Sequence, residues 1–94
     1  MQYMKKIKDA GLSSLLGAYH SRGKAACTLV HSDGHAESNC LLRVTELRRL
    51  DRRYHLVEGQ YFSDYEGGKG WLPILIHFDE VRREGMVLSS PESE

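Results

Sequence analysis

The chain of 94 residues has the length of one small domain, and its 13 basic and 13 acidic residues give a formal net charge of +0. A balanced chain does not attract nucleic acid as a whole, although a local basic patch still can. No apolar run approaches the roughly 18 residues of a membrane span, and the opening MQYMKKIKDAGL lacks the apolar segment of a signal peptide. We therefore expect a cytoplasmic protein that does not enter a membrane.

Residues 3–20 are predicted to form a helix. Four apolar side chains have the i, i+3, i+4, i+7 spacing of one helix face: Leu12, Leu15, Leu16 and Tyr19. Met4 and Ile7 extend this stripe less regularly, and Gly11 is a point at which the helix can kink or divide.

From residue 24 the apolar pattern changes to the alternation that is typical of strands. Five segments carry this alternation: KAACTLVHS, HAESNCLLRVTELRR, RRYHLVEGQYF, GWLPILIHF and REGMVL. A glycine-rich loop, SDYEGGKG, follows the third of them. The polar end of the chain has the composition of a disordered segment. We expect a single helix-plus-barrel domain over residues 1–88 and a disordered tail over residues 89–94.

The segment HSDGH, residues 31–35, predicts the tip of the first hairpin. Its Asp-Gly pair favours a two-residue turn, because type I′ geometry needs positive φ at both central positions. In that register His31 and His35 point to opposite faces. A three-residue loop would instead bring both imidazoles to one face, where they could hold a metal ion.

The hydrophobic pattern favours the two-residue register, because it gathers an apolar core set on one face. This set consists of Cys27, Leu29, Ala36, Cys40 and Leu42. Cys27 and Cys40 then lie directly opposite each other. Since only 2 cysteines are present and no secretion signal precedes them, we expect buried thiols in place of a disulfide.

The second hairpin is predicted to turn at Asp51-Arg52, which pairs Leu47 with Leu56. Its apolar phase is odd-numbered, whereas the preceding part of the same strand has an even phase. A β-bulge near Thr45-Glu46 reconciles the two phases. One long, bulged strand shared by two hairpins is typical of small five-stranded barrels.

These features resemble an Sm-like (SH3-like) barrel, and the implied fold class is α+β, mainly β. The expected order is an N-terminal helix followed by a five-stranded, strongly bent antiparallel barrel. The stretch "CTLVHSDGHAES…LRVTELRRLDRRYHLVEG…ILIHFDEV" resembles the WYL domain, with Tyr54-His55-Leu56-Val57 as third strand. That family's ligand-site tryptophan and arginines have no counterparts here, so its ligand binding is not carried over.

The same span resembles the Rof family, small inhibitors of the Rho termination factor. Rof proteins also begin with a short helix and run through an "H…L.L.DG" segment into a barrel ending "LDKI". Ala18-Tyr19-His20 and Asp33-Gly34 match that outline. The resemblance implies a regulator that works by binding another protein.

Enzyme signatures are missing from the sequence. It contains no GxSxG elbow, no GxxxxGK[ST] phosphate loop, no HExxH and no CxxC pair. We expect a protein that is not an enzyme, with no catalytic residues, no metal site and no cofactor.

Two candidate partner-binding surfaces remain. The first is the arginine hairpin, formed by Arg48, Arg49, Arg52 and Arg53 with Arg43 nearby. Arginine forks suit phosphate or carboxylate groups. The second is the aromatic set around the glycine-rich loop, formed by Tyr61, Phe62, Tyr65 and Trp71. Exposed aromatic rings can anchor a protein partner or stack on bases.

The resulting hypothesis is a small non-enzymatic regulatory protein that binds and modulates a protein partner. A bacterial or phage inhibitor of a nucleic-acid-processing machine fits this description. The alternative is an Sm-like nucleic-acid-binding module that uses the arginine hairpin. The sequence leaves the oligomeric state open.

Overall fold

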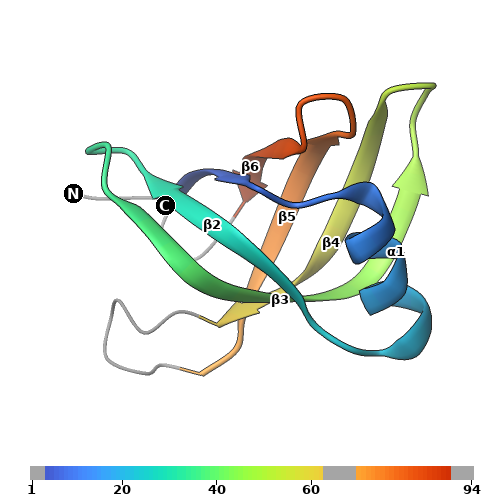
Figure 1. Cartoon of the computed structure of the whole chain (residues 1–94), viewed down its shortest axis with the longest axis horizontal. Coiled ribbons are helices and arrows are strands. Elements are labelled where there is room, and N and C mark those ends of the chain that lie inside the picture. Colours follow the sequence, from blue (N-terminus) through green and yellow to red (C-terminus); the bar gives the residue numbers. More distant parts are fainter. Residues whose placement is uncertain (1–3, 63–69, 90–94) are drawn as a thin grey trace.

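The computed structural model describes residues 4–62 and 70–89, which form a closed barrel of six antiparallel strands and one helix (Figure 1). The strands are β1 (Met4–Lys8), β2 (Ala25–His31), β3 (Ala36–Arg49), β4 (Tyr54–Phe62), β5 (Leu72–Asp79) and β6 (Glu84–Ser89). The helix α1 (Leu12–Ser21) lies between β1 and β2. Within the described residues, no helix is long and apolar enough to span a membrane.

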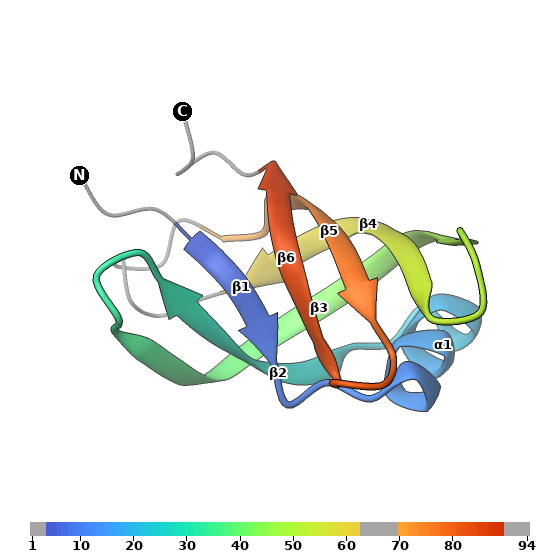
Figure 2. The ribbon, with the colours of Figure 1, turned by 90° about the horizontal axis from the view of Figure 1, so that it is seen from above.

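The first part of the predicted helix is a strand, so the barrel has six strands and not the expected five. Residues 4–8 form β1, which pairs with β2 on one side and β6 on the other (Figure 2). In this position β1 pairs with the edges of β2 and β6, which would otherwise be unpaired, and closes the barrel. Ile7 is fully buried there. Long-range pairing of this kind outweighs the local helical spacing of Met4 and Ile7.

The second part of the prediction is confirmed by α1. Asp9, with φ 59°, turns the chain out of β1, and Gly11 is the residue before the first helical turn. The backbone N–H of Ala10 donates to the carbonyl of Arg83 at 3.2 Å, which fixes the start of the helix to the β5–β6 turn. Leu15 and Ala18 are buried against the barrel.

The five strands predicted from alternation are all present, with bounds that differ by at most two residues. The predicted β-bulge is also confirmed, because the β3–β4 register shifts between Val44 and Glu46. Gly59 lies opposite this bulge, and a Cβ atom there would overlap the carbonyl oxygen of Arg43. The bulge lets β3 serve both hairpins.

The tip of the first hairpin corrects the predicted register. The backbone N–H of His31 donates to the carbonyl of His35 at 2.8 Å, and Gly34 has φ 91°, so residues 32–34 form a three-residue loop. His31 and His35 therefore have their ring centroids 5.8 Å apart and do not point to opposite faces. The Asp33 carboxylate accepts from the N–H of His35 at 2.9 Å, which stabilises this loop.

A register shift farther from the tip returns the rest of the first hairpin to the predicted pairing. Leu29 pairs with Glu37 near the tip, but a shift between Cys27 and Leu29 returns Cys27 to its predicted place opposite Cys40. Both thiols are free and buried, as expected. Because the bulge changes the phase of β2, Thr28 is buried together with its two neighbours.

The second hairpin differs from its prediction by one residue. Leu47 pairs with Val57, not Leu56, and the loop contains three residues, 51–53. The Asp51 carboxylate accepts from the N–H groups of Arg53 and Tyr54, each at 2.8 Å. In both hairpins an aspartate at the tip therefore stabilises a loop one residue longer than the dipeptide pattern predicts.

Candidate functional site

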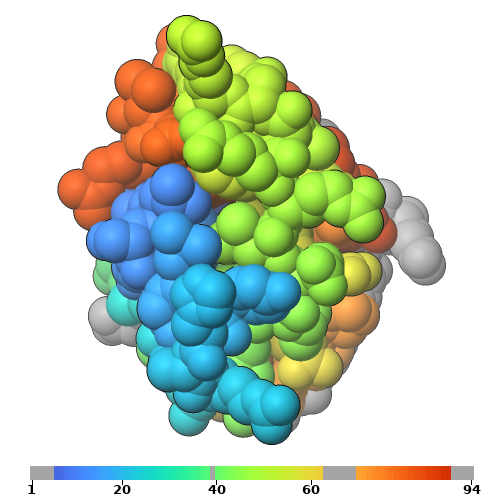
Figure 3. All heavy atoms as spheres, turned by 90° about the vertical axis from the view of Figure 1, so that its right-hand side faces the viewer, coloured from blue at the N-terminus to red at the C-terminus, as the bar shows by residue number. Residues whose placement is uncertain are grey.

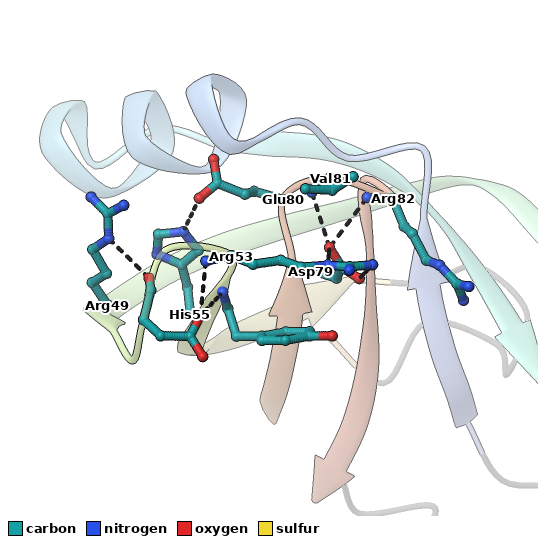
Figure 4. A network of polar contacts seen from close by, with 9 residues as sticks. Arg49, Arg53, His55, Asp79, Glu80, Val81 and Arg82 are labelled. Atoms are coloured by element: carbon teal, nitrogen blue, oxygen red, sulfur yellow. Dashed lines mark hydrogen bonds and ion pairs between the residues drawn. The ribbon is translucent and has the colours of Figure 1, made fainter.

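The β3–β4 turn is joined to the β5–β6 turn by a charged fork. Arg53 Nε donates to Asp79 Oδ1 at 2.9 Å, and Arg53 Nη2 donates to Asp79 Oδ2 at 2.7 Å (Figure 4). Asp79 Oδ1 also accepts from the N–H groups of Val81 at 3.0 Å and Arg82 at 3.3 Å. Bonds from Arg53 above all lower the pKa of Asp79 to about 2. The two turns thus form one rigid end of the barrel, which we call the turn end (residues 50–54 and 80–83).

Other contacts reinforce the turn end. Arg49 Nε donates to the carbonyl of Asp51 at 2.9 Å, and His55 Nε2 lies 3.2 Å from Glu80 Oε1. The N–H of Glu80 donates to the carbonyl of Arg53 at 3.0 Å. Backbone bonds from Arg53 and Tyr54 lower the pKa of Asp51. The conformation of the two turns is therefore set largely by Asp51 and Asp79, which the pattern of arginines in the sequence does not indicate.

The four arginines of the predicted hairpin surface therefore have two different roles. Arg49 and Arg53 are bonded within the turn end. Arg48 and Arg52 are exposed, and neither makes a hydrogen bond or ion pair with another residue in the described part of the chain. Arg48 and Arg52 therefore present whole guanidinium groups to a partner, whereas Arg49 keeps only its exposed terminal nitrogens for one.

A pocket of about 320 Å³ opens on the outer face of the barrel beside the turn end. A row of outward positions crosses five strands here, in register: Arg48, Leu56, His77, Met86 and Lys6. Tyr54 and His77 stack in the pocket with ring centroids 4.8 Å apart, beside Met86. We call this the Tyr54–Met86 pocket.

Sequence reasoning missed the Tyr54–Met86 pocket. The alternation of β4 and β5 does place Tyr54 and His77 outward, which is the signal that could have found them. Met86 is 63% exposed. The sequence pattern placed Met86 in a strand without giving its direction, and the register with Lys6 and His77 turns it outward.

The predicted aromatic set is divided by the fold. Tyr61 is 1% exposed and belongs to the barrel core, so its ring is not available to a partner. Phe62 and Trp71 are half-buried neighbours with ring centroids 5.5 Å apart. Tyr65 lies outside the described residues. The Arg43 guanidinium, predicted from the sequence to lie near the arginine hairpin, instead stacks on Trp71, 3.8 Å from the ring centroid.

Comparisons with known proteins identify no relative of this chain. No protein-family model matches the chain, and neither the curated proteins nor the solved structures include a significant match. The resemblances to Rof and to the WYL domain therefore gain no support beyond the small closed barrel itself. Across residues 4–62 and 70–89, no three His, Cys, Asp or Glu side chains are grouped as metal ligands.

Proposed function

We propose that the protein is a non-enzymatic regulator that binds a protein partner through the Tyr54–Met86 pocket and the turn end. The observation that carries the proposal is the exposure of Met86 beside the stacked rings of Tyr54 and His77. Covering a large exposed apolar side chain with a partner removes apolar surface from water, which favours binding. An aromatic wall with an adaptable thioether suits an inserted apolar side chain.

The charges around the pocket indicate what such a partner carries next to its apolar anchor. Two of the acidic groups are already matched, since Asp79 binds Arg53 and Glu84 lies 3.5 Å from Lys6. Arg82 lines the pocket with no ion pair to another described residue, and Arg52 is exposed on the adjacent turn. The partner group that fits this surface is an apolar side chain flanked by carboxylates.

The arginine turn supports a protein partner better than a nucleic-acid strand. The fork with Asp79 commits Arg53, and the bond from Arg49 Nε restrains Arg49, so fewer of the four arginines are fully available for phosphates on this hairpin. Two exposed apolar side chains, Leu50 and Val81, also lie on the turn end. Apolar groups among cations are typical of protein interfaces. A regulator of a nucleic-acid-processing machine, as the resemblance to Rof implies, is consistent with this surface.

The test compares immobilised wild-type protein with the Met86→Asp variant in a lysate of the native host. A protein retained by the wild type is identified by mass spectrometry, purified and titrated by calorimetry. We expect Met86→Asp to weaken its binding at least tenfold, which corresponds to about 1.4 kcal/mol. Arg82→Glu should weaken it as well, mainly through slower association at low salt.

Ser38→Asp is the matched control, because Ser38 is exposed on β3 but lies in the other hairpin. This variant should bind as the wild type does. Circular dichroism on all variants establishes that the barrel is folded. A purified partner that binds Met86→Asp and Arg82→Glu with wild-type affinity would contradict the proposal.

A further inference from the structure

A second, larger cavity lies between the end of α1 and the middle of β3. Its volume is about 660 Å³. Four lining side chains are aromatic or basic: Tyr19, His20, Arg22 and Arg43. Among the described residues that line it there is no Asp or Glu. Figure 3 shows this side of the molecule, where α1 (blue to cyan) lies against β3 (green). We call this the α1–β3 cleft.

Cationic and aromatic groups continue from the cleft to the start of β5. Arg43, which lines the cleft, stacks on Trp71, and Lys24 Nζ lies 5.7 Å from the centroid of the same ring. Phe62 is the next ring along. The surface therefore combines positive charge with aromatic rings from four separate segments of the chain.

Two features of the fold account for the positions of the arginines. A cation near the C-terminus of a helix interacts favourably with the helix dipole, which accounts for Arg22. Arg43 comes from β3, and its stack on Trp71 holds it at the edge of the cleft. Within the described residues, none of Arg22, Lys24 and Arg43 forms an ion pair. The cleft is thus a concentration of positive charge on a chain whose net charge is +0.

We propose that the α1–β3 cleft binds single-stranded nucleic acid. Arg22 and Arg43 contact the phosphates, and a base stacks against the Tyr19–His20 pair, whose ring centroids are 5.2 Å apart. A cationic track with aromatic platforms is the arrangement by which proteins bind single strands without reading sequence. The site is separate from the Tyr54–Met86 pocket, with which it shares no lining residue.

The probes are 12-nucleotide oligouridylate and oligodeoxythymidylate, titrated into the whole protein at 50 mM salt. Trp71 is the only tryptophan of the chain, and Arg43 stacks on its ring. The tryptophan emission therefore reports on a ligand that contacts Arg43. We expect saturable binding that changes this emission. With two or three phosphate contacts, affinity should fall roughly seven- to eighteen-fold between 50 and 200 mM salt, since the slope is about −0.7 per contact for single strands.

Arg22→Gln tests the assignment without disturbing the core, because Arg22 is exposed. It should weaken binding at least about threefold at 50 mM salt and make the salt slope shallower by about 0.7. Arg52→Gln, which removes an exposed arginine from the turn end, is the matched control and should bind as the wild type does. His20→Ala, also an exposed position, should weaken binding through lost stacking with an unchanged salt slope.

Three results would overturn the proposal. One is no binding of either oligonucleotide at 50 mM salt. A second is an equal loss in Arg22→Gln and Arg52→Gln, which would show that only overall charge matters. The third is equally tight binding of inorganic polyphosphate of matched length, because a ligand without bases would make the aromatic groups irrelevant.

Discussion

Arg53 and Asp79 are 26 positions apart in sequence, yet they form a two-bond fork with N···O distances of 2.9 and 2.7 Å. This contact joins the tips of two hairpins, and Asp79 at the same time holds the N–H groups of the β5–β6 turn. A planar fork of this kind depends on the guanidinium and is not reproduced by an ammonium group. The shape of the turn end, and of the adjoining pocket, follows from it.

We expect Arg53→Lys to destabilise the protein more than Arg52→Lys. Both changes preserve the charge, but only the first removes a bidentate contact, since Arg52 makes no hydrogen bond or ion pair with another described residue. Thermal unfolding of the two variants at neutral pH measures the difference. Equal melting temperatures would show that the fork contributes nothing specific beyond charge.

The stability of the protein should also depend on pH through Asp79. Its pKa in the folded state is lowered from 3.8 to about 2, first of all by Arg53. A lowered folded-state pKa means that the stabilisation is fully present above the unfolded-state value and is lost as pH falls through the folded-state value. We therefore expect the loss between about pH 4 and about pH 2.

Asp79→Asn isolates this contribution, because Asp51, whose pKa is also lowered, titrates in both proteins. Denaturant unfolding should show a constant difference between wild type and Asp79→Asn above about pH 5, shrinking toward pH 2. Parallel pH profiles down to pH 2 would be inconsistent with the fork.

Substitution by alanine should have opposite effects on stability at Gly59, opposite the β3 bulge, and at Gly17, within α1. At Gly59 an added Cβ would overlap the Arg43 carbonyl, whereas at Gly17, within α1, nothing lies within 4 Å. Gly59→Ala should cost about 1–3 kcal/mol through overpacking. Gly17→Ala should stabilise the protein by about 0.5–1 kcal/mol, because alanine favours the helix. Urea unfolding measures both, and a stabilising effect at Gly59 would contradict the bulge geometry.

Adjacent aromatic residues on β4 should behave differently as well. Tyr61 is in the core, so Tyr61→Ala should cost about 3–5 kcal/mol. Phe62 is half-buried against Trp71, so Phe62→Ala should cost about 1 kcal/mol. Chemical denaturation of both variants gives the comparison. Similar losses would mean that the alternation of inward and outward side chains breaks down at the end of β4.

The parts of the fold that were predictable from sequence are those set by local alternation. The five strands, the buried Cys27–Cys40 pair and the bulge beyond Val44 all follow from which residues repeat every second position. The strand β1 was not predictable in this way, because it depends on the distant pairs Lys6–Met86 and Ile7–Gly85 with β6. The predicted length of the two hairpin loops was wrong for a different reason. Side-chain bonds from Asp33 and Asp51 favour three-residue loops that the flanking hydrophobic pattern does not encode.

The same distinction holds for the candidate sites. The sequence predicted one surface from arginines close together in the chain, but Arg53 binds Asp79 and Arg49 Nε binds the carbonyl of Asp51. The pocket near Met86 and the α1–β3 cleft both combine residues from distant segments, so they depend on the closed barrel and cannot be read from neighbouring positions.

Cys27 and Cys40, paired across β2 and β3, should be protected from thiol reagents in the native protein. Both side chains are buried, and Cys40 Sγ donates to the carbonyl of Leu41 at 3.6 Å. The facing Cys27 side chain, and then burial, raise the pKa of Cys40. The thiolate form of Cys40 is therefore disfavoured, and burial shields both side chains from the reagent. We expect no reaction with Ellman's reagent under native conditions and reaction of both thiols in denaturant.

The rate of labelling at intermediate denaturant distinguishes global from local opening. If the barrel must unfold before either thiol reacts, the labelling rate follows the population of unfolded protein measured by circular dichroism. Cys27→Ala and Cys40→Ala then each leave one thiol with the same protection, after correction for their lower stability. Rapid labelling of one remaining thiol in a protein that is still folded would show that the β2–β3 hairpin opens locally, and that its register shift is a weak point of the barrel.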